Sequence, residues 1–407
     1  MCDVIKKQKT IELANIFSQY ADAYIKDRGV SATQNKAIKA ISRCRTAALG
    51  GHIARCNNCG KEEQSYNSCR YRHCPKCQTT KQLRWLEDRK TELLPVPYFH
   101  VVFTVPHELN ALASYNPTVI YNVLFKAAWK TIDTLGRDPK RLSGLMGMMA
   151  FLHTWGQNLS QHIHLHCMIP GGALYIEALQ AKWRATRKGF LFPVKVMSKL
   201  FGKTFVSLLK QVFTEGKLLF KGSIAKLEED HHFEQLLALL GSKSWNVYAK
   251  EPFNGAAGGL EYLARYVSKT ALSNERIISC ENGEIRFKWR DYSDHNKEKV
   301  LSLKAEEFIR RYLSHVLPDG FMRIRFFGFL ANACKTRNIN TIRALFGHQE
   351  STANTTSISK DKEPIAQLML RLTGIDIERC KHCKIGRLFV EKSIVNAGPF
   401  NTYPDTS

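Results

Sequence analysis

The sequence lacks any hydrophobic run that is long enough to cross a membrane. None of its 407 residues belongs to a stretch of roughly 18 consecutive apolar residues, the length that a spanning helix needs. Residues 1–17 are charged and have no apolar core of the kind found in secretory signals. We therefore expect a cytoplasmic protein with no membrane partner, whose cysteines stay reduced and are better interpreted as metal ligands than as disulfides.

Acidic residues are few relative to basic ones. The chain has 36 Asp and Glu against 60 Lys and Arg, which gives a net charge of +24. Such an excess favours a polyanionic partner, and nucleic acid fits because each neutralised phosphate releases counterions. The alternatives are a membrane surface, or a basic protein without such a partner. A Gly-rich phosphate loop of the Walker type is also missing, so we expect no nucleotide cofactor.

Hydrophobic periodicity indicates helices and strands in succession, so the predicted fold class is α+β. The chain divides into an N-terminal helical segment (1–43), a Cys- and His-rich module (44–94), a mixed domain (95–280), a basic, mostly helical region (281–348), a polar linker (349–363) and a short C-terminal module with a disordered tail (364–407).

Strands and helices are predicted along most of the chain from the alternation of apolar residues. The predicted strands are 98–105, 147–155, 163–169 and 245–252, with a hairpin joining the second and third, and a further pair at 285–292 and 299–303. The predicted helices are 80–94, 109–134, 197–240, 260–273, 308–316 and 323–333.

Two Cys-x-x-Cys knuckles occur in the Cys-rich module, at Cys56–Cys59 and Cys74–Cys77. A knuckle places two thiolates on one tight turn, and two knuckles complete a tetrahedral zinc site. Further candidate ligands in the same stretch are Cys44, His52, Cys69 and His73. Eight ligands are the number that two closed sites need, so we predict one or two structural Zn²⁺ ions and favour two. The spacing leaves open how the ligands divide between the sites.

Basic residues are interleaved with these ligands, so the module is also predicted to contact DNA. A third knuckle, Cys380–Cys383, stands apart in the C-terminal module and supplies only half of a tetrahedral site. It is predicted to be vestigial, unless Cys334 or His348 completes it.

Alternating histidines, His162, His164 and His166, occupy one predicted strand. Every second side chain of a strand faces the same way, so the three imidazoles line one face. Two or three of them can hold a divalent cation, which can polarise a phosphodiester. A third ligand is left open among His162, Gln157 and His153.

Two tyrosines, Tyr262 and Tyr266, stand at positions i and i+4 of a predicted helix that follows a Gly-rich turn. Such a pair by itself is typical of helix packing. Arg265 and Lys269 lie beside the pair, and cations assist attack by a phenol, whose unperturbed pKa is about 10. In company with the histidines and the charge, the tyrosines become candidate nucleophiles, and the two cations become candidate contacts to DNA phosphates.

Taken together, these motifs resemble those of the HUH rolling-circle transposases of bacterial insertion sequences, insertion-sequence ninety-one type. The His-hydrophobic-His match is residues 164–166, and residues 44–77 look like the family's N-terminal zinc-binding segment. The stretches 94–109 and 308–321 are also family-like, and the resemblance covers about residues 12–345. It implies an HUH endonuclease domain, an antiparallel sheet with helices, after a small zinc-binding module.

The resemblance implies a transposase that is a single-strand DNA endonuclease and strand transferase. His164 and His166 would bind Mg²⁺ or Mn²⁺, and a tyrosine would attack single-stranded DNA at the element ends. The products would be a 5′-phosphotyrosine and a free 3′ hydroxyl, with a second tyrosine serving the next transfer into target DNA. Location at the bacterial nucleoid follows. The alternatives are a plasmid replication initiator or relaxase with the same chemistry, a non-catalytic zinc-finger DNA-binding protein, and a hydrolytic metallonuclease.

Overall fold

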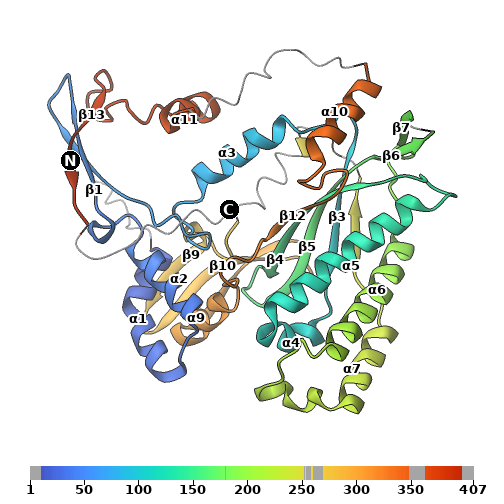
Figure 1. Cartoon of the computed structure of the whole chain (residues 1–407). Helices are drawn as coiled ribbons and strands as arrows, with labels where there is room; N and C mark the ends of the chain where they lie inside the picture. The colour runs from blue at the N-terminus through green and yellow to red at the C-terminus, as the bar shows by residue number, and fades with distance from the viewer. Residues whose placement is uncertain are drawn as a thin grey trace.

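A five-stranded antiparallel sheet forms the centre of the structure (Figure 1). The computed structural model describes residues 11–178, 180–251, 253, 258–259, 269–347 and 363–396. In spatial order the strands are β12 (Ile324–Gly328), β4 (Gly147–Trp155), β5 (Gln161–Pro170), β3 (Tyr98–Thr104) and β8 (Val247–Lys250). The predicted α+β class is confirmed.

Strands β4 and β5 form the predicted hairpin at the middle of this sheet. The turn closes where the amide of Gly156 donates to the carbonyl of Ser160 at 2.9 Å. Both strands are buried along most of their length, which matches their apolar composition. Because successive residues alternate between faces, Ile163 and Leu165 enter the main core while the histidines between them face the other way.

Helices cover one face of the central sheet and bury its aliphatic and aromatic side chains (Figure 1). Two long predicted helices are each broken in two. The first breaks at Asn116, because Pro117 has no amide proton to continue a helix but is well suited to begin one. The four resulting helices are α4 (Asn110–Tyr115), α5 (Pro117–Arg137), α6 (Val194–Thr214) and α7 (Asp230–Ser242).

A second core joins the N-terminal helices to the basic region. The predicted strand pair is confirmed, with Ile285 opposite Leu303. Phe17 of the first helix packs edge-on against Tyr312, with ring centroids 5.6 Å apart. The elements of this core are α1 (Leu13–Arg28), α2 (Ala32–Arg43), β9 (Ile277–Glu281), β10 (Glu284–Asp291), β11 (Lys297–Lys304) and α9 (Ala305–Leu313).

One predicted helix is wrong, and another lies mostly outside the described residues. The segment predicted as a helix at 323–333 instead contains β12, which pairs with β4 so that Phe326 lies opposite Met149. Its Ile-Arg-Phe-Phe sequence favours a strand, and the free edge of β4 supplies the hydrogen-bond partners that decide the outcome. The helix predicted at 260–273 lies mostly outside the described residues, and its described end, residues 269–273, is not helical.

The end of the described chain returns to its beginning. Strand β13 (Leu388–Ile394) pairs antiparallel with β1 (Gly51–Cys56), which also pairs with β2 (Glu62–Tyr66). Helix α11 (Ile365–Thr373) lies along α3 (Thr79–Lys90), where Arg371 forms an ion pair with Glu87 at 2.7 Å (Figure 1). The remaining elements are β6 (Gly172–Glu177), β7 (Gln180–Ala185) and α10 (Lys335–Leu345).

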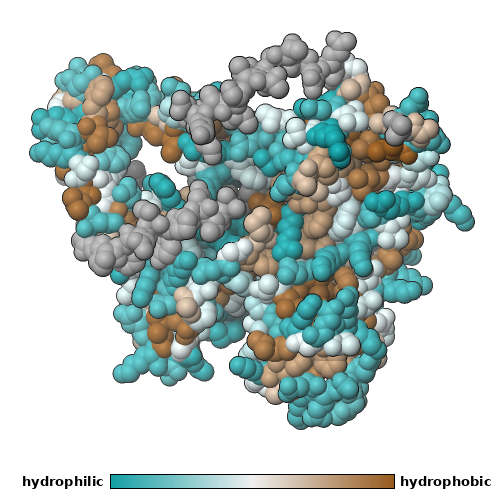
Figure 2. All heavy atoms as spheres, viewed as in Figure 1, coloured by the Kyte–Doolittle hydropathy of each residue, from teal (hydrophilic) through white to brown (hydrophobic). Residues whose placement is uncertain are grey.

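Hydrophilic side chains cover much of the face that Figure 2 presents, including the surfaces of α1 and α7. Among the residues that the structure describes, every helix is too short or too polar to span a bilayer.

Candidate functional site

Three buried histidines meet on one face of the central sheet. His164 and His166 alternate along β5, and His153 stands directly opposite His164 on β4. Their ring nitrogens lie within 4.8 Å of one another, and the Nε2 atoms of His164 and His166 are 3.1 Å apart. All three side chains are buried. The hairpin thus brings both predicted ligands together with one of the three candidates for the third position.

The other two candidates do not belong to this group of three, although the ring centroid of His162 lies 4.9 Å from that of His164. His162 is exposed, and its backbone carbonyl accepts a hydrogen bond from Nδ1 of His164 at 2.8 Å. Gln157 lies in the turn between β4 and β5, where its side-chain amide donates to the hydroxyl of Tyr292 at 3.1 Å. The carbonyl of Gln157 accepts from Arg276. The turn is therefore tied to the β9–β11 sheet rather than to the histidines.

A fourth histidine, His100 on β3, was not found from the sequence. Its Nε2 lies 2.9 Å from Nδ1 of His166, and the two rings stack with centroids 5.2 Å apart and planes 15° apart. The sequence placed His100 in a strand, but a lone histidine in a strand carries no signal until the register with β5 is known. His100 and His164 therefore hold the two ring nitrogens of His166 from opposite sides.

Burial keeps these imidazoles in the neutral form. Removal from water disfavours the protonated ring, so burial lowers the pKa of His164 to about 3, with the charges of His162 and Lys269 adding to the effect. Burial likewise lowers the pKa of His166, and that of His100 to about 4. A neutral imidazole offers a nitrogen lone pair, and this is the form that binds a metal ion.

The predicted nucleophiles Tyr262 and Tyr266, together with Arg265, lie outside the described residues. Lys269 is described, and its positive charge acts on both His164 and His166. On the other side of the tyrosine segment, Lys250 lies opposite His100 in the register of β8 and β3. The described residues that flank this segment on both sides are thus close to the histidine cluster.

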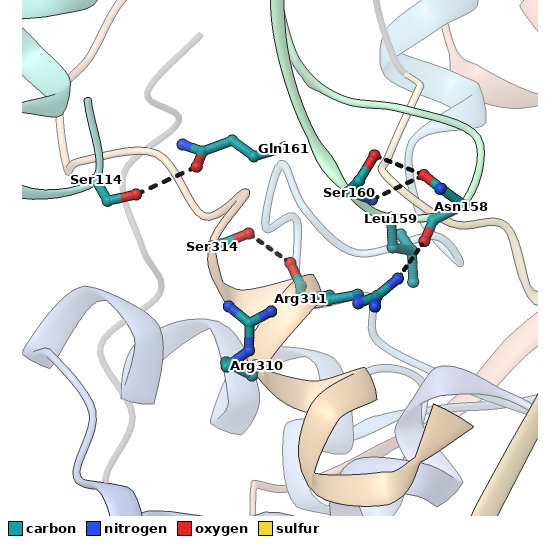
Figure 3. Close-up of a pocket in the computed structure, with 8 residues that line it drawn as sticks. All are labelled: Ser114, Asn158, Leu159, Ser160, Gln161, Arg310, Arg311 and Ser314. Atoms are coloured by element: carbon teal, nitrogen blue, oxygen red, sulfur yellow. Dashed lines mark hydrogen bonds between the residues drawn. The ribbon is translucent and has the colours of Figure 1, made fainter. Parts of the chain in front are cut away.

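A polar pocket of about 390 Å³ opens beside the turn between β4 and β5 (Figure 3). Arg310 and Arg311 reach it from α9, and Nη1 of Arg311 donates to the carbonyl of Asn158 at 3.3 Å. Gln161, the first residue of β5, also lines it and stands three positions before His164, which is about 10 Å along a strand. The other lining residues are Ser114, Leu159, Ser160 and Ser314.

Four cysteines of the zinc module gather within the second core. Their sulfur atoms lie within 4.8 Å of one another, and those of Cys69 and Cys77 are 3.7 Å apart. The amide of Cys69 donates to the sulfur of Cys44 at 3.4 Å. The neighbouring cysteines, Cys69 foremost, lower the pKa of the Cys44 thiol. The group consists of Cys44, Cys69, Cys74 and Cys77.

A second group of four cysteines joins the two ends of the described chain. The sulfurs of Cys56 and Cys383 are 3.6 Å apart, and those of Cys59 and Cys380 are 3.8 Å apart. The two knuckles of the zinc module thus belong to different groups. The C-terminal knuckle, predicted to be vestigial unless Cys334 or His348 completes it, supplies the other half of the second group. The proposed partners differ as well: Cys334 donates to backbone carbonyls, and His348 lies outside the described residues.

Neither histidine of the zinc module belongs to a cysteine group. His52 lies on β1 opposite Ser65. His73 is buried, and its Nε2 accepts a hydrogen bond from the amide of Leu317 at 3.2 Å. The lone pair that a metal would need is therefore used to attach the module to the segment that follows α9.

Two family models match the chain. One, described as "Transposase zinc-binding domain", matches residues 16–105 and contains the first cysteine group whole. The other, described as "Putative transposase", matches residues 147–337 and contains His153, His164 and His166.

Two curated proteins resemble the chain over most of its length. It is 42% identical over 378 residues to "Putative transposase y4qJ" of Sinorhizobium fredii (strain NBRC 101917 / NGR234), covering 93% of this chain and 94% of that protein. It is 25% identical over 322 residues to the "Transposase for insertion sequence element IS801" of Pseudomonas savastanoi pv. phaseolicola, covering 76% and 73%. No solved structure gives a significant match.

The chain belongs to the transposase family of the insertion-sequence ninety-one type, with an N-terminal zinc-binding domain. The predicted family is confirmed. Transposition is a reaction on DNA that requires strand cleavage and strand transfer, so these are the activities of the class, and DNA is its partner.

Proposed function

We propose that this transposase cleaves single-stranded DNA at the ends of its element by tyrosine transesterification, as the first step of rolling-circle transposition. The observation that carries the proposal is the three-histidine cluster of β4 and β5, because residues flanking the tyrosine segment lie beside it. A zinc-finger protein without catalytic activity would have no use for such a cluster.

The histidine cluster fits Mg²⁺ or Mn²⁺. Two donors at right angles around a cation bonded at about 2.1 Å lie about 3 Å apart, and the two Nε2 atoms are 3.1 Å apart. Nδ1 of His164 donates to a carbonyl, and Nδ1 of His166 faces His100, so both rings can present Nε2 to one ion. When bound, the ion would polarise the scissile phosphodiester and neutralise developing charge.

His153 is the third ligand that we propose, in preference to His162 and Gln157. It is buried opposite His164, and one of its ring nitrogens lies within 4.8 Å of those of the other two histidines. Its ring stacks on Trp155 with centroids 4.5 Å apart, which limits the orientations that the ring can take.

Tyr262 and Tyr266 are the nucleophiles that we propose. Lys269 follows Tyr266 by three residues, a stretch that spans at most about 10 Å, so the phenol can reach the cluster on which Lys269 acts. The phenolic oxygen would bond to phosphorus as the bond to the 3′ oxygen breaks. The phenol loses its proton and the 3′ oxygen gains one, so the energy of the phosphodiester is kept without ATP.

DNA phosphates would meet positive side chains around this centre. Lys269 acts on the histidines themselves, and Arg265 precedes it on the same segment. The Arg310 and Arg311 pocket lies further along the hairpin and could hold the strand beyond the cleaved bond. Element ends and target DNA would both use this surface, and we place the enzyme at the bacterial nucleoid.

Zn²⁺ fits the first cysteine group, Cys44, Cys69, Cys74 and Cys77. Tetrahedral Zn–S bonds of about 2.3 Å put neighbouring sulfurs about 3.8 Å apart, and Cys69 and Cys77 are separated by 3.7 Å. Four protein ligands leave no position for substrate, so the ion would be structural.

A trapped adduct tests the mechanism. The enzyme is incubated with a single-stranded oligonucleotide of the element end and Mn²⁺, denatured, and analysed by gel electrophoresis. Wild type should give a slow-migrating covalent complex, and the Tyr262→Phe, Tyr266→Phe double variant should give none. Tyr292→Phe, which alters an exposed tyrosine, is the matched control. An adduct in the double variant refutes the tyrosine mechanism, and cleavage without any adduct identifies a hydrolytic nuclease.

A further inference from the structure

The second cysteine group has the dimensions of a metal site. Its two sulfur pairs, one between Cys56 and Cys383 and one between Cys59 and Cys380, are separated by 3.6 Å and 3.8 Å. These values match the roughly 3.8 Å edge of a tetrahedral zinc–thiolate site and far exceed the roughly 2.05 Å of a disulfide. The zinc-binding family match ends at residue 105 and so contains only half of this group.

The two knuckles of this group have the same backbone turn. The amide of Gly60 donates to the carbonyl of Cys56 at 3.1 Å, and the amide of Lys384 donates to that of Cys380 at 3.0 Å. The residue after each second cysteine is left-handed, with φ of 68° at Gly60 and 58° at Lys384. Equivalent turns facing each other present four sulfurs to one point, as in zinc ribbons.

Backbone groups are placed around the sulfurs as a thiolate requires. The amide of Asn58 donates to the sulfur of Cys56 at 3.4 Å, and that of Gly386 donates to Cys383 at 3.3 Å. The two turns are packed so closely that a Cβ atom on Gly386 would lie 2.4 Å from the sulfur of Cys56. Only glycine fits at this point, so the two halves of the group are fitted to each other.

We propose that Cys56, Cys59, Cys380 and Cys383 bind a second structural Zn²⁺, whose ligands come from opposite ends of the chain and fasten the C-terminal module to the N-terminal zinc domain. Within residues 363–396, Leu368 and Cys380 are the only buried side chains. Such a module buries too little apolar surface to fold alone, and a metal ion is a common substitute for a core.

The contacts around the second cysteine group can orient the C-terminal module, but they contribute little stability. Strand β13 is mostly exposed, and its register on β1 ends where Cys56 lies opposite Leu388. The flanking ion pairs are also exposed: Arg55 to Glu391 at 3.1 Å and Lys381 to Glu63 at 3.4 Å. Exposed pairs contribute little. Backbone pairing would therefore set the register of the docked module, and the metal would supply its stability.

Zinc stoichiometry tests the proposal on the full chain. Native mass spectrometry of purified wild type should show two Zn²⁺ per chain, and the Cys380→Ser, Cys383→Ser double variant should show one. Cys334→Ser, whose thiol donates to the backbone carbonyls of Gly328 and Ala331, should keep two. One zinc in wild type, two in the double variant, or a wild-type mass two hydrogens lower from a disulfide would each overturn the proposal.

A cleavable linker provides a second measurement that does not depend on the double variant being well folded. A protease site is introduced between residues 349 and 362, and the full-length protein is cut in its native state. The C-terminal fragment should stay bound to the rest through gel filtration and should separate after zinc is removed with a strong chelator. Two results would refute the proposal that zinc holds the C-terminal module in place. One is separation without the chelator, and the other is continued association after metal analysis shows that all zinc is gone.

Discussion

The histidine cluster and the cysteine groups differ in the number of ligands that the chain supplies. The cluster has three histidines, whereas each cysteine group has four thiols. A six-coordinate Mg²⁺ or Mn²⁺ on three protein ligands keeps positions open for phosphate oxygens, but a tetrahedral zinc on four thiolates is closed. On the function proposed above, the histidine centre would act on DNA, and the two cysteine groups would stabilise the fold. Loss of a ligand should cost activity in the first case and stability in the second.

The largest effect is expected from His164→Ala. This change removes a proposed metal ligand of the histidine cluster, so cleavage and adduct formation should disappear. Binding of single-stranded DNA and the melting temperature should stay close to wild type. Gel assays, fluorescence anisotropy and calorimetry measure the three properties. The matched control is His162→Ala, which alters an exposed histidine on the same strand and should keep cleavage. Equal losses in both variants would contradict the assignment of ligands.

Cys69→Ser should have the largest effect on stability. It breaks the first cysteine group, which lies in the core shared by α1, α2 and α9, and forfeits zinc-binding free energy on the order of 10 kcal/mol. We expect loss of one zinc and unfolding of the surrounding core, detected by circular dichroism and hydrogen exchange. Cys280→Ser alters a cysteine outside both groups and should melt like wild type. A Cys69→Ser protein that stays folded and keeps its zinc would contradict a structural role for zinc in the first cysteine group.

His100→Ala should lower the metal affinity of the histidine cluster without abolishing it. His100 positions His166 through the 2.9 Å contact, and loss of such an outer partner costs about 10–100-fold in metal affinity or activity. The Mn²⁺ concentration for half-maximal cleavage should rise by that factor, whereas the rate at saturating Mn²⁺ should change less. His100→Gln, which keeps a nitrogen at a similar reach, should recover part of the affinity. An unchanged Mn²⁺ dependence would show that His100 only fills space.

His315→Gln should flatten the pH dependence of stability. His315 is buried between the hydroxyl of Thr154 and the carbonyl of Leu159, and burial lowers its pKa to about 4. Because the unfolded pKa is about 6.5, the unfolded chain binds the proton first. The contribution is complete above pH 6.5 and is lost as pH falls toward 4, by about 3 kcal/mol in total. Urea unfolding between pH 7.5 and 4.5 should show a shallower slope for the variant, and an identical slope would contradict this.

Lys381→Ala should have the smallest effect. The side chain of Lys381 is 83% exposed where it pairs with Glu63, and such pairs contribute at most about 1 kcal/mol. Calorimetry should detect almost no change in melting temperature, and both zinc ions should remain. Release of the C-terminal fragment by this change alone would mean that ion pairs, rather than the metal group, hold β13 in place.

Parts of the site were predictable because their geometry is local. The alternation of His164 and His166 along a strand, and the turn that places His153 opposite His164, follow from residues within one hairpin. The role of His100 could not be predicted from the sequence, because it depends on the register between β3 and β5. Hydrophobic periodicity predicts a helix at 323–333, because nothing within this segment indicates that the edge of β4 is available for pairing.

Composition and local spacing alone were enough to predict a nucleic-acid partner from the net charge of +24, the HUH-type histidine strand, the zinc-binding knuckles and the family. Only the tertiary structure decided which knuckles share a group, since Cys56 and Cys383 are separated by 327 positions. Spacing within a turn fixes which two thiolates can act together, but the pairing of one turn with another depends on how β1 and β13 meet. That meeting is set by strand register and packing across the whole chain, which no local pattern encodes.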